Sequence, residues 1–362
     1  MKEAMFYEKL DKMKVQCRLC PNNCVILHGK RGSCNVRENR AGVLYSLVYG
    51  LPCTANPDPI EKKPLFHFLP GTGAYSIATP GCNLHCKWCQ NWQISQRGPD
   101  EVECFSMPPE DVVKNALRTG CKSIAYTYVE PAIFYEYVLD TAKLARKAGL
   151  KNIMVTNGYL NPEPVKLLYR YIDACNVDLK GFTDEFYREY CGGRLKPILD
   201  MIKTVHKMGV WVELTTLMIP GLNDSPDLIR KQCEWIKELD PEIPLHFSRF
   251  FPYYKMSHLP PTPPETLKKA YEIAQDVGLK NVYVGNIDLP GTEDTFCPKC
   301  GEKVIARNAY FTVRTNKVTP EGKCSFCGTK IAGVFSASKK QSAKPKAKPA
   351  ARSKVKKVSK KK

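Results

Sequence analysis

The stretch AYSIATPGCNLHCKWCQNW, residues 74–92, joins a short strand-like segment directly to three closely spaced cysteines. Cys82, Cys86 and Cys89 form the pattern C-x3-C-x2-C, and this loop offers no fourth cysteine. Three thiolates at this spacing can bind three irons of a [4Fe–4S] cluster, which leaves one iron open to a small molecule. A structural zinc site fits this loop less well, because such a site needs four protein ligands and the loop offers three thiolates.

Strand-like and helix-like segments alternate after residue 74 over roughly 200 residues. The strand-like segments are short and rich in Val, Ile, Thr or aromatic residues, as strands buried on both faces are. They span residues 74–80, 123–129, 152–157, 172–180, 211–220, 245–252 and 281–286. Helix-like segments with Pro or acids near the start span residues 108–120, 131–149, 225–240 and 263–278.

This alternation predicts parallel βα units joined by right-handed crossovers. Seven strands are one short of a closed barrel, so we expect an α/β fold that forms an incomplete, TIM-like (β/α) barrel. The cysteine loop follows the first strand and would lie at the C-terminal mouth of the parallel strands. Barrels of this kind place their active sites there.

Composition divides the chain into four parts. Residues 1–73 are a cysteine-rich N-terminal segment whose Pro-rich second half is expected to be irregular and extended. The barrel spans 74–290, and a four-cysteine module spans 291–337. The tail 338–362 holds eleven Lys, one Arg and no acid, and it has almost nothing to bury, so we expect it to be disordered.

The net charge of +19 is concentrated in that tail, because residues 1–337 carry only +7. Binding of nucleic acid is therefore expected only through the tail, the four-cysteine module or a local patch. No run of eighteen apolar residues indicates a membrane span. The first residues lack the apolar core of a secretory signal, so a cytoplasmic location is expected.

Seventeen cysteines, an odd number with tight C-x-x-C pairs, indicate metal ligation rather than a disulfide framework. Outside the three clusters, six single cysteines are interpreted as small buried hydrophobes. Two pairs near the C-terminus predict a zinc-ribbon-like site, with zinc preferred over iron; they are Cys297, Cys300, Cys324 and Cys327. An N-terminal set could hold one zinc or an auxiliary iron–sulfur cluster, with Cys53 as a possible substitute; it comprises Cys17, Cys20, Cys24 and Cys34.

The three-cysteine motif, with Trp88 before its last cysteine, resembles that of the radical S-adenosylmethionine (SAM) superfamily. The segment GCNLHCKWCQN is similar to the activating enzymes of glycyl-radical enzymes, such as the pyruvate formate-lyase activase type. Over residues 17–335 the chain resembles the radical SAM member of the AmmeMemoRadiSam system. The supporting motifs are CRLCPNNC, YTYVEPAIFYEY, NVDLKGF, HFSRFFPYYKM, FCPKCG and CSFCG.

This resemblance implies a radical SAM barrel and a reaction. The open iron chelates SAM, one electron cleaves it to methionine and a 5′-deoxyadenosyl radical, and the radical abstracts hydrogen from a substrate. Forming a glycyl radical on a partner protein is the most specific version. The resemblance also implies an electron donor such as flavodoxin or ferredoxin, and partners of the Memo and AMMECR families.

The resemblance further implies residues that contact SAM. Glu130 or the Thr127 backbone would accept from the SAM ammonium; the alternative for Glu130 is a cap on the next helix. Asn157 would reach SAM unless its Asn-Gly dipeptide is an ordinary turn. Asp178 and Lys180 point to one face of a strand, where charges need a partner or a function. The remaining candidate is His246, for which a core histidine is the alternative.

Two other functions stay open at this point. A radical SAM enzyme that modifies RNA is suggested by the basic tail and the four-cysteine module. A zinc-binding adaptor built on an inactive barrel is the alternative from a different class. Replacing a cysteine of the C-x3-C-x2-C motif separates the adaptor from both enzymes, since an adaptor would keep its partners.

Overall fold

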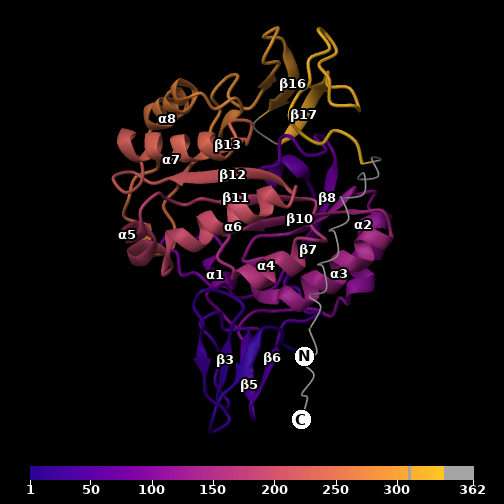
Figure 1. The fold of residues 1–362 in the computed structure, drawn as a ribbon, viewed down its shortest axis with the longest axis vertical. Helices are drawn as coiled ribbons and strands as arrows, with labels where there is room; N and C mark the ends of the chain where they lie inside the picture. Colours follow the sequence, from indigo (N-terminus) through magenta and orange to yellow (C-terminus); the bar gives the residue numbers. More distant parts are fainter. Residues whose placement is uncertain (309–310, 338–362) are drawn as a thin grey trace, which may run out of the picture.

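The computed structural model describes residues 1–308 and 311–337. Two small N-terminal sheets lie at one end of the long axis, the main sheet with its helices lies in the middle, and the four-cysteine module lies at the other end (Figure 1). The predicted disordered tail, 338–362, falls outside the described residues.

The main sheet contains all seven predicted strands, in sequence order and parallel to one another. They are β8 (Gly73–Ala78), β9 (Ser123–Tyr126), β10 (Lys151–Thr156), β11 (Ala174–Asp178), β12 (Trp211–Met218), β13 (Leu245–Arg249) and β14 (Val282–Gly285). The first and last strands of the sheet do not pair with each other. This open α/β arrangement agrees with the predicted incomplete (β/α) barrel.

An eighth strand, β7 (Thr54–Pro59), lies antiparallel beside β8 at the edge of this sheet. The sequence prediction was wrong here, because it treated this Pro-rich stretch as irregular and counted seven strands. Pro57 and Pro59 cannot donate ladder hydrogen bonds, but an edge strand tolerates them. The expected boundary between residues 73 and 74 therefore falls within β8 and assigns the paired strands β7 and β8 to different parts of the chain.

Helices occupy most connections between the parallel strands (Figure 1). The α-helices are α1 (Trp92–Ser95), α2 (Pro109–Arg118), α3 (Tyr135–Lys147), α4 (Pro162–Leu168), α5 (Asp184–Phe186), α6 (Leu195–Lys207), α7 (Pro226–Leu239) and α8 (Pro264–Val277). Shorter turns are η1 (Ile60–Lys62), η2 (Pro131–Phe134), η3 (Tyr187–Cys191, a π-helix) and η4 (Tyr254–Met256). None of the helices in the described part is long and apolar enough to cross a membrane.

The N-terminal segment forms two three-stranded antiparallel sheets. One contains β2 (Tyr7–Lys9), β3 (Val15–Cys17) and β4 (Val25–Ile26); the other contains β1 (Lys2–Glu3), β6 (Val43–Ser46) and β5 (Arg37–Arg40). Arg37 ties them to the barrel through a fully buried ion pair with Glu136 of α3. Removing one partner of such a buried pair typically costs about 3–5 kcal/mol.

The C-terminal module contains β15 (Thr295–Phe296), β16 (Lys303–Asn308) and β17 (Thr312–Asn316). Arg307 of β16 anchors it to the segment that follows β7. Its guanidinium donates to the Phe66 carbonyl oxygen at 2.6 Å and lies 4.2 Å from the centre of the Phe66 ring. The module is therefore joined to the barrel by the buried Arg307 side chain.

Candidate active site

The loop that carries Cys82, Cys86 and Cys89 leaves the carboxyl end of β8 and lines a cavity of about 240 Å³. The other strands contribute polar residues from the same end of the sheet. Predicted site residues that line this cavity are Glu130, Asn157, Asp178 and Lys180. Further lining residues are Leu84, Trp88, Gln90, Asn91, Ser95, Gln96, Tyr128, Val129, Thr215, Leu217, Ser248 and Asn286.

Gly81 sets the path of the loop immediately before Cys82. Its φ is +95°, and a Cβ at this position would lie 2.5 Å from the Cys34 carbonyl oxygen and 2.6 Å from a methyl of Val36. Only glycine accommodates both the backbone conformation and this close approach. The N-terminal sheets therefore pack directly against the start of the cysteine loop.

Hydrogen-bond donors surround the sulfur atoms of the loop. The Leu84 amide donates to Cys82 Sγ at 3.5 Å, and Asn157 Nδ2 lies 3.8 Å from the same sulfur. Cys89 Sγ lies 3.2 Å from Ser95 Oγ. Three free thiols from one loop, with N–H and O–H groups directed at them, fit the ligand set and outer contacts of an iron–sulfur cluster.

A fourth cysteine, Cys191 at the end of η3, lies buried beside Cys86. A hydrogen bond from Cys191 lowers the pKa of the Cys86 thiol, and burial opposes that shift. The Cys191 carbonyl oxygen also accepts from the His85 amide at 2.7 Å, which braces the loop. Cys191 does not line the cavity, and its position in the sequence gave no signal of this contact.

Glu130 is held by three hydrogen bonds at the start of η2. Its carboxylate accepts from the Ala132 amide at 2.9 Å, from Thr156 Oγ1 at 2.7 Å and from the Asn157 amide at 2.7 Å. Burial raises the pKa of Glu130 to about 7, and these donors act in the opposite direction. The carboxylate therefore caps η2 and joins the ends of β9 and β10. The other predicted contact, Thr127, does not line the cavity, and its carbonyl oxygen accepts from the Val129 amide.

Asp178 and Lys180 form the charged pair of the cavity. Lys180 Nζ donates to Asp178 Oδ2 at 2.8 Å. The Lys180 side chain is 15% exposed and the Asp178 side chain is 37% exposed. Burial lowers the pKa of Lys180, but the Asp178 carboxylate, together with the Cys86 and Cys191 sulfurs, raises it well above its usual value. Lys180 therefore stays protonated, while Asp178 retains an accessible oxygen for a ligand.

A model of the family described as "Radical SAM superfamily" matches residues 76–233, which include most of the residues that line this cavity. The chain belongs to the radical SAM superfamily. It is therefore an enzyme of the oxidoreductase type, and the superfamily implies a [4Fe–4S] cluster and SAM.

The chain is also similar to several individual proteins. The chain is 48% identical over 332 positions to a Methanocaldococcus jannaschii protein named "Uncharacterized protein MJ0808". The aligned region covers 91% of this chain and 99% of that protein. Identity is 26% over 168 positions to the pyruvate formate-lyase-activating enzyme of Clostridium pasteurianum, covering 44% and 67%. A solved domain of such an activating enzyme from Bacteroides vulgatus gives a TM-score of 0.40 at 21% identity, covering 45% of this chain and 99% of that domain.

His246 lies away from the cavity of this radical SAM barrel. Its Nε2 lies 2.7 Å from Glu213 Oε2, and its ring stacks on Tyr283 with 5.2 Å between centres. Glu213 also accepts from the backbone amides of Phe66 and His67. The structure thus places His246 in the barrel interior, as the core-histidine alternative has it, and does not bring it to the cysteines.

The sulfur atoms of the four C-terminal cysteines lie close enough together to bind one metal ion. In the described part of the chain, they are the one set of three or more His, Cys, Asp or Glu residues with ligand atoms within 4.8 Å of one another. The Cys297–Cys327 and Cys300–Cys324 sulfur distances are 3.6 and 3.8 Å. Sulfurs about 2.3 Å from a tetrahedral ion would lie about 3.8 Å apart, so this set fits one metal ion.

The N-terminal cysteines surround a cavity of about 20 Å³. All four line it, together with Arg37, whose guanidinium lies 3.5 Å from Cys17 Sγ. Burial raises the pKa of Cys34 to about 11. These sulfurs are gathered, but in the described residues they are not within the 4.8 Å spacing of the C-terminal set.

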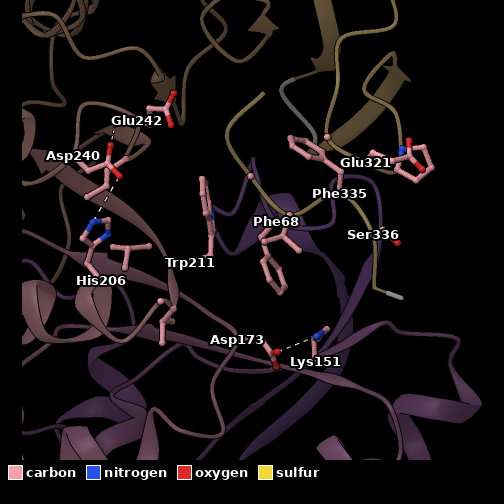
Figure 2. Close-up of a pocket in the computed structure, with 18 residues that line it drawn as sticks. Phe68, Lys151, Asp173, His206, Trp211, Asp240, Glu242, Glu321, Phe335 and Ser336 are labelled. Carbon is pink, nitrogen blue, oxygen red and sulfur yellow. Dashed lines mark hydrogen bonds and ion pairs between the residues drawn. The ribbon is translucent and has the colours of Figure 1, made fainter. Parts of the chain in front are cut away.

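A larger cavity, of about 650 Å³, lies at the opposite end of the parallel strands, against the C-terminal module (Figure 2). Trp211, the first residue of β12, faces Phe68 and Phe335 across it. Its polar lining includes two ion pairs, Lys151–Asp173 and His206–Asp240. Sequence analysis did not predict this cavity. It contains no cysteine and lies away from the face where such barrels carry active sites, so we assign the active site to the smaller cavity.

Proposed function

We propose that this chain reductively cleaves SAM at Cys82, Cys86 and Cys89 and abstracts hydrogen from a substrate held in the adjoining cavity. The observation that carries the proposal is that the three cysteines share one cavity with Asn157, Asp178 and Lys180. A [4Fe–4S] cluster held by these three thiolates would pass one electron to SAM, whose cleavage gives methionine and a 5′-deoxyadenosyl radical.

The chain's own residues hold and protect this chemistry. Asn157 and Ser95 direct hydrogen-bond donors at the sulfurs of Cys82 and Cys89. Asp178 offers a carboxylate oxygen to the SAM ammonium, and Lys180 fixes that carboxylate. These contacts orient SAM on the cysteine side of the cavity.

Apolar side chains keep water from the same side. Leu84 and Trp88 are 1% and 4% exposed, and Trp88 packs on Phe186 with 5.5 Å between ring centres. A closed site matters because a carbon radical abstracts hydrogen from any accessible C–H group, and tight packing limits which groups can approach it.

We also propose metals at both flanking cysteine sets. The sulfur distances of the C-terminal set support a tetrahedral four-thiolate site. Zinc is the proposed ion and iron is the alternative, because both ions form such sites. For the N-terminal set, zinc and an auxiliary iron–sulfur cluster both stay open. Metal analysis of the purified protein separates these cases.

Finer parts of the resemblance stay predictions: membership of the AmmeMemoRadiSam system, partners of the Memo and AMMECR families, a flavodoxin or ferredoxin donor, and a cytoplasmic location. A glycine on a partner protein is one candidate substrate, supported by the similarity to pyruvate formate-lyase-activating enzymes. The zinc-binding adaptor remains the alternative that the following experiment must exclude.

The test uses anaerobically purified, reconstituted protein with dithionite and SAM. We expect 5′-deoxyadenosine from the wild-type chain and none from Cys86→Ala. Cys233→Ala is the matched control, because it removes a buried thiol of α7 that does not line the cavity. No product from wild type, with zinc but no sulfide present, would contradict the proposal and favour the adaptor.

A further inference from the structure

Four basic side chains on segments that adjoin the candidate active site each lie over an aromatic ring. The distances from the charged group to the ring centre are 4.8–5.8 Å. The pairs are Lys87 on Tyr190, Arg97 on Trp92, Arg249 on Phe251, and Lys255 on Tyr254. We call these eight residues the basic rim.

The basic rim is continuous with the cavity. The rings of Trp92 and Tyr254 stack, with 5.3 Å between centres and 13° between planes. The Lys255 amide donates to the Lys87 carbonyl oxygen at 2.9 Å, which joins η4 to the cysteine loop. Cavity-lining residues lie next to the rim in sequence: Asn91 before Trp92, Gln96 before Arg97, and Ser248 before Arg249.

The positive charge of the rim is not compensated by acids. Among the described residues, none of its four cations takes part in an ion pair. Arg97 and Lys255 are exposed. Tyr254 has a φ of +54°, a backbone conformation that non-glycine residues rarely adopt and that is enriched at functional sites. The surface therefore presents cations without acidic partners beside aromatic rings, although Arg249 Nε donates to the Thr262 carbonyl oxygen.

This combination matches the two parts of a single-stranded nucleic acid. Lys and Arg side chains bind phosphates, and aromatic rings stack on bases of any sequence. An acidic peptide would use the cations but not the stacked rings. Gln96, Ser248 and Asn286 add neutral donors and acceptors at the cavity wall, which suit base edges and the 2′-hydroxyl of RNA.

We propose that the basic rim binds single-stranded RNA and delivers one nucleotide of it to the cavity. This inference rests on the proposed function, because it names the substrate class of that same site. It places the RNA contact on the rim around the cysteine loop rather than on the Lys-rich tail or the four-cysteine module.

The test measures binding of a fluorescein-labelled, unstructured 12-nucleotide RNA to the full-length protein by fluorescence anisotropy at several salt concentrations. The rim variant is Arg97→Gln/Lys255→Gln. The control is Lys268→Gln/Lys269→Gln on the exposed face of α8, which removes the same charge. We expect the rim variant to bind at least tenfold more weakly and the control to bind within twofold of wild type.

The salt dependence separates charge from stacking. Loss of two phosphate contacts should reduce the slope of log K against log salt by about 1.4, at about 0.7 per contact with a single strand. Trp92→Leu should weaken binding about fivefold or more and change this slope less than the rim variant does, because it removes a stacking ring but no charge. DNA of the same sequence should bind more weakly than RNA.

Equal affinity of the rim variant and the control would overturn the inference, because the tail alone would then explain binding. Tighter binding of a labelled acidic, glycine-containing 12-residue peptide than of RNA would also overturn it. 5′-Deoxyadenosine formation by the wild-type protein is assayed in parallel. Product without rim-dependent RNA binding contradicts this inference and leaves the proposed function standing, whereas rim-dependent binding without product supports the surface and contradicts the proposed function.

Discussion

Replacing Glu130 by Ala decides between the two interpretations of this residue. The substitution leaves three donors without an acceptor: the amides of Ala132 and Asn157 and the hydroxyl of Thr156. The hydroxyl can rotate, but the two amides cannot. An unsatisfied buried donor costs about 2 kcal/mol, so we expect Glu130→Ala to lower the free energy of unfolding by about 4 kcal/mol. Glu130→Gln keeps one carbonyl oxygen and should lose about half as much.

Urea unfolding of the cluster-free protein under reducing conditions, followed by tryptophan fluorescence, measures this loss. Thr141→Ala is the matched control, because Thr141 is buried in α3 and its hydroxyl has no hydrogen-bond partner. An unchanged unfolding midpoint in Glu130→Ala, together with loss of SAM cleavage after reconstitution, would refute the capping role. Glu130 would then contact SAM directly.

Three further predictions address the parts around the site. Gly81→Ala should reduce the iron and sulfide content of reconstituted protein at least threefold, since the added Cβ would lie 2.5 Å from the Cys34 oxygen; Gly120→Ala, at a turn with open space around it, is the control, and wild-type cluster content in Gly81→Ala would contradict this account. Cys300→Ser should lose one equivalent of metal and lower the melting temperature; metal content measured by mass spectrometry that stays at the wild-type level would exclude a four-thiolate site. Burial, opposed by Arg307, raises the pKa of Glu61 from 4.5 to about 7, so the folded state keeps a proton that the unfolded state releases. The free energy of unfolding should therefore fall by about 3 kcal/mol between pH 4.5 and 7, and urea titrations should show that Glu61→Gln flattens this fall; an equal slope in both proteins would refute the shift.

The parallel strands could be predicted because each carries its own signal. β10 and β12 are short runs rich in β-branched residues, and their burial on both faces leaves a nearly continuous apolar pattern. β7 carries the opposite pattern, since two prolines disfavour a strand everywhere except at an edge. Its pairing with β8 depends on tertiary position, which local sequence does not encode.

The helix α6 was missed although its pattern was present. Ile198, Met201, Ile202 and Val205 are buried at helical spacing. Its start has no side-chain cap and no acid in the first turn, so Pro197 is the one start signal present there. The helix therefore forms because its apolar residues recur at helical spacing, although its ends carry weak signals.

Within the site, the residues that could be predicted lie on one loop or one strand. The cysteine spacing, and the pair Asp178 and Lys180, are local patterns. The neighbour of Cys86, Cys191, and the capping role of Glu130 depend on contacts across the fold. No spacing in the sequence reports such contacts, and the same is true of the Cys34 oxygen that requires Gly81.

The central claim is that the Cys82–Cys86–Cys89 loop holds a [4Fe–4S] cluster with an iron open to SAM. Electron paramagnetic resonance of the reduced, reconstituted protein, recorded with and without SAM, tests it most directly. The account predicts that SAM changes the cluster signal in wild type and that this change is absent in Cys86→Ala, whatever metals the flanking cysteines hold. A reduced cluster signal that SAM leaves unaltered in wild type would contradict the claim.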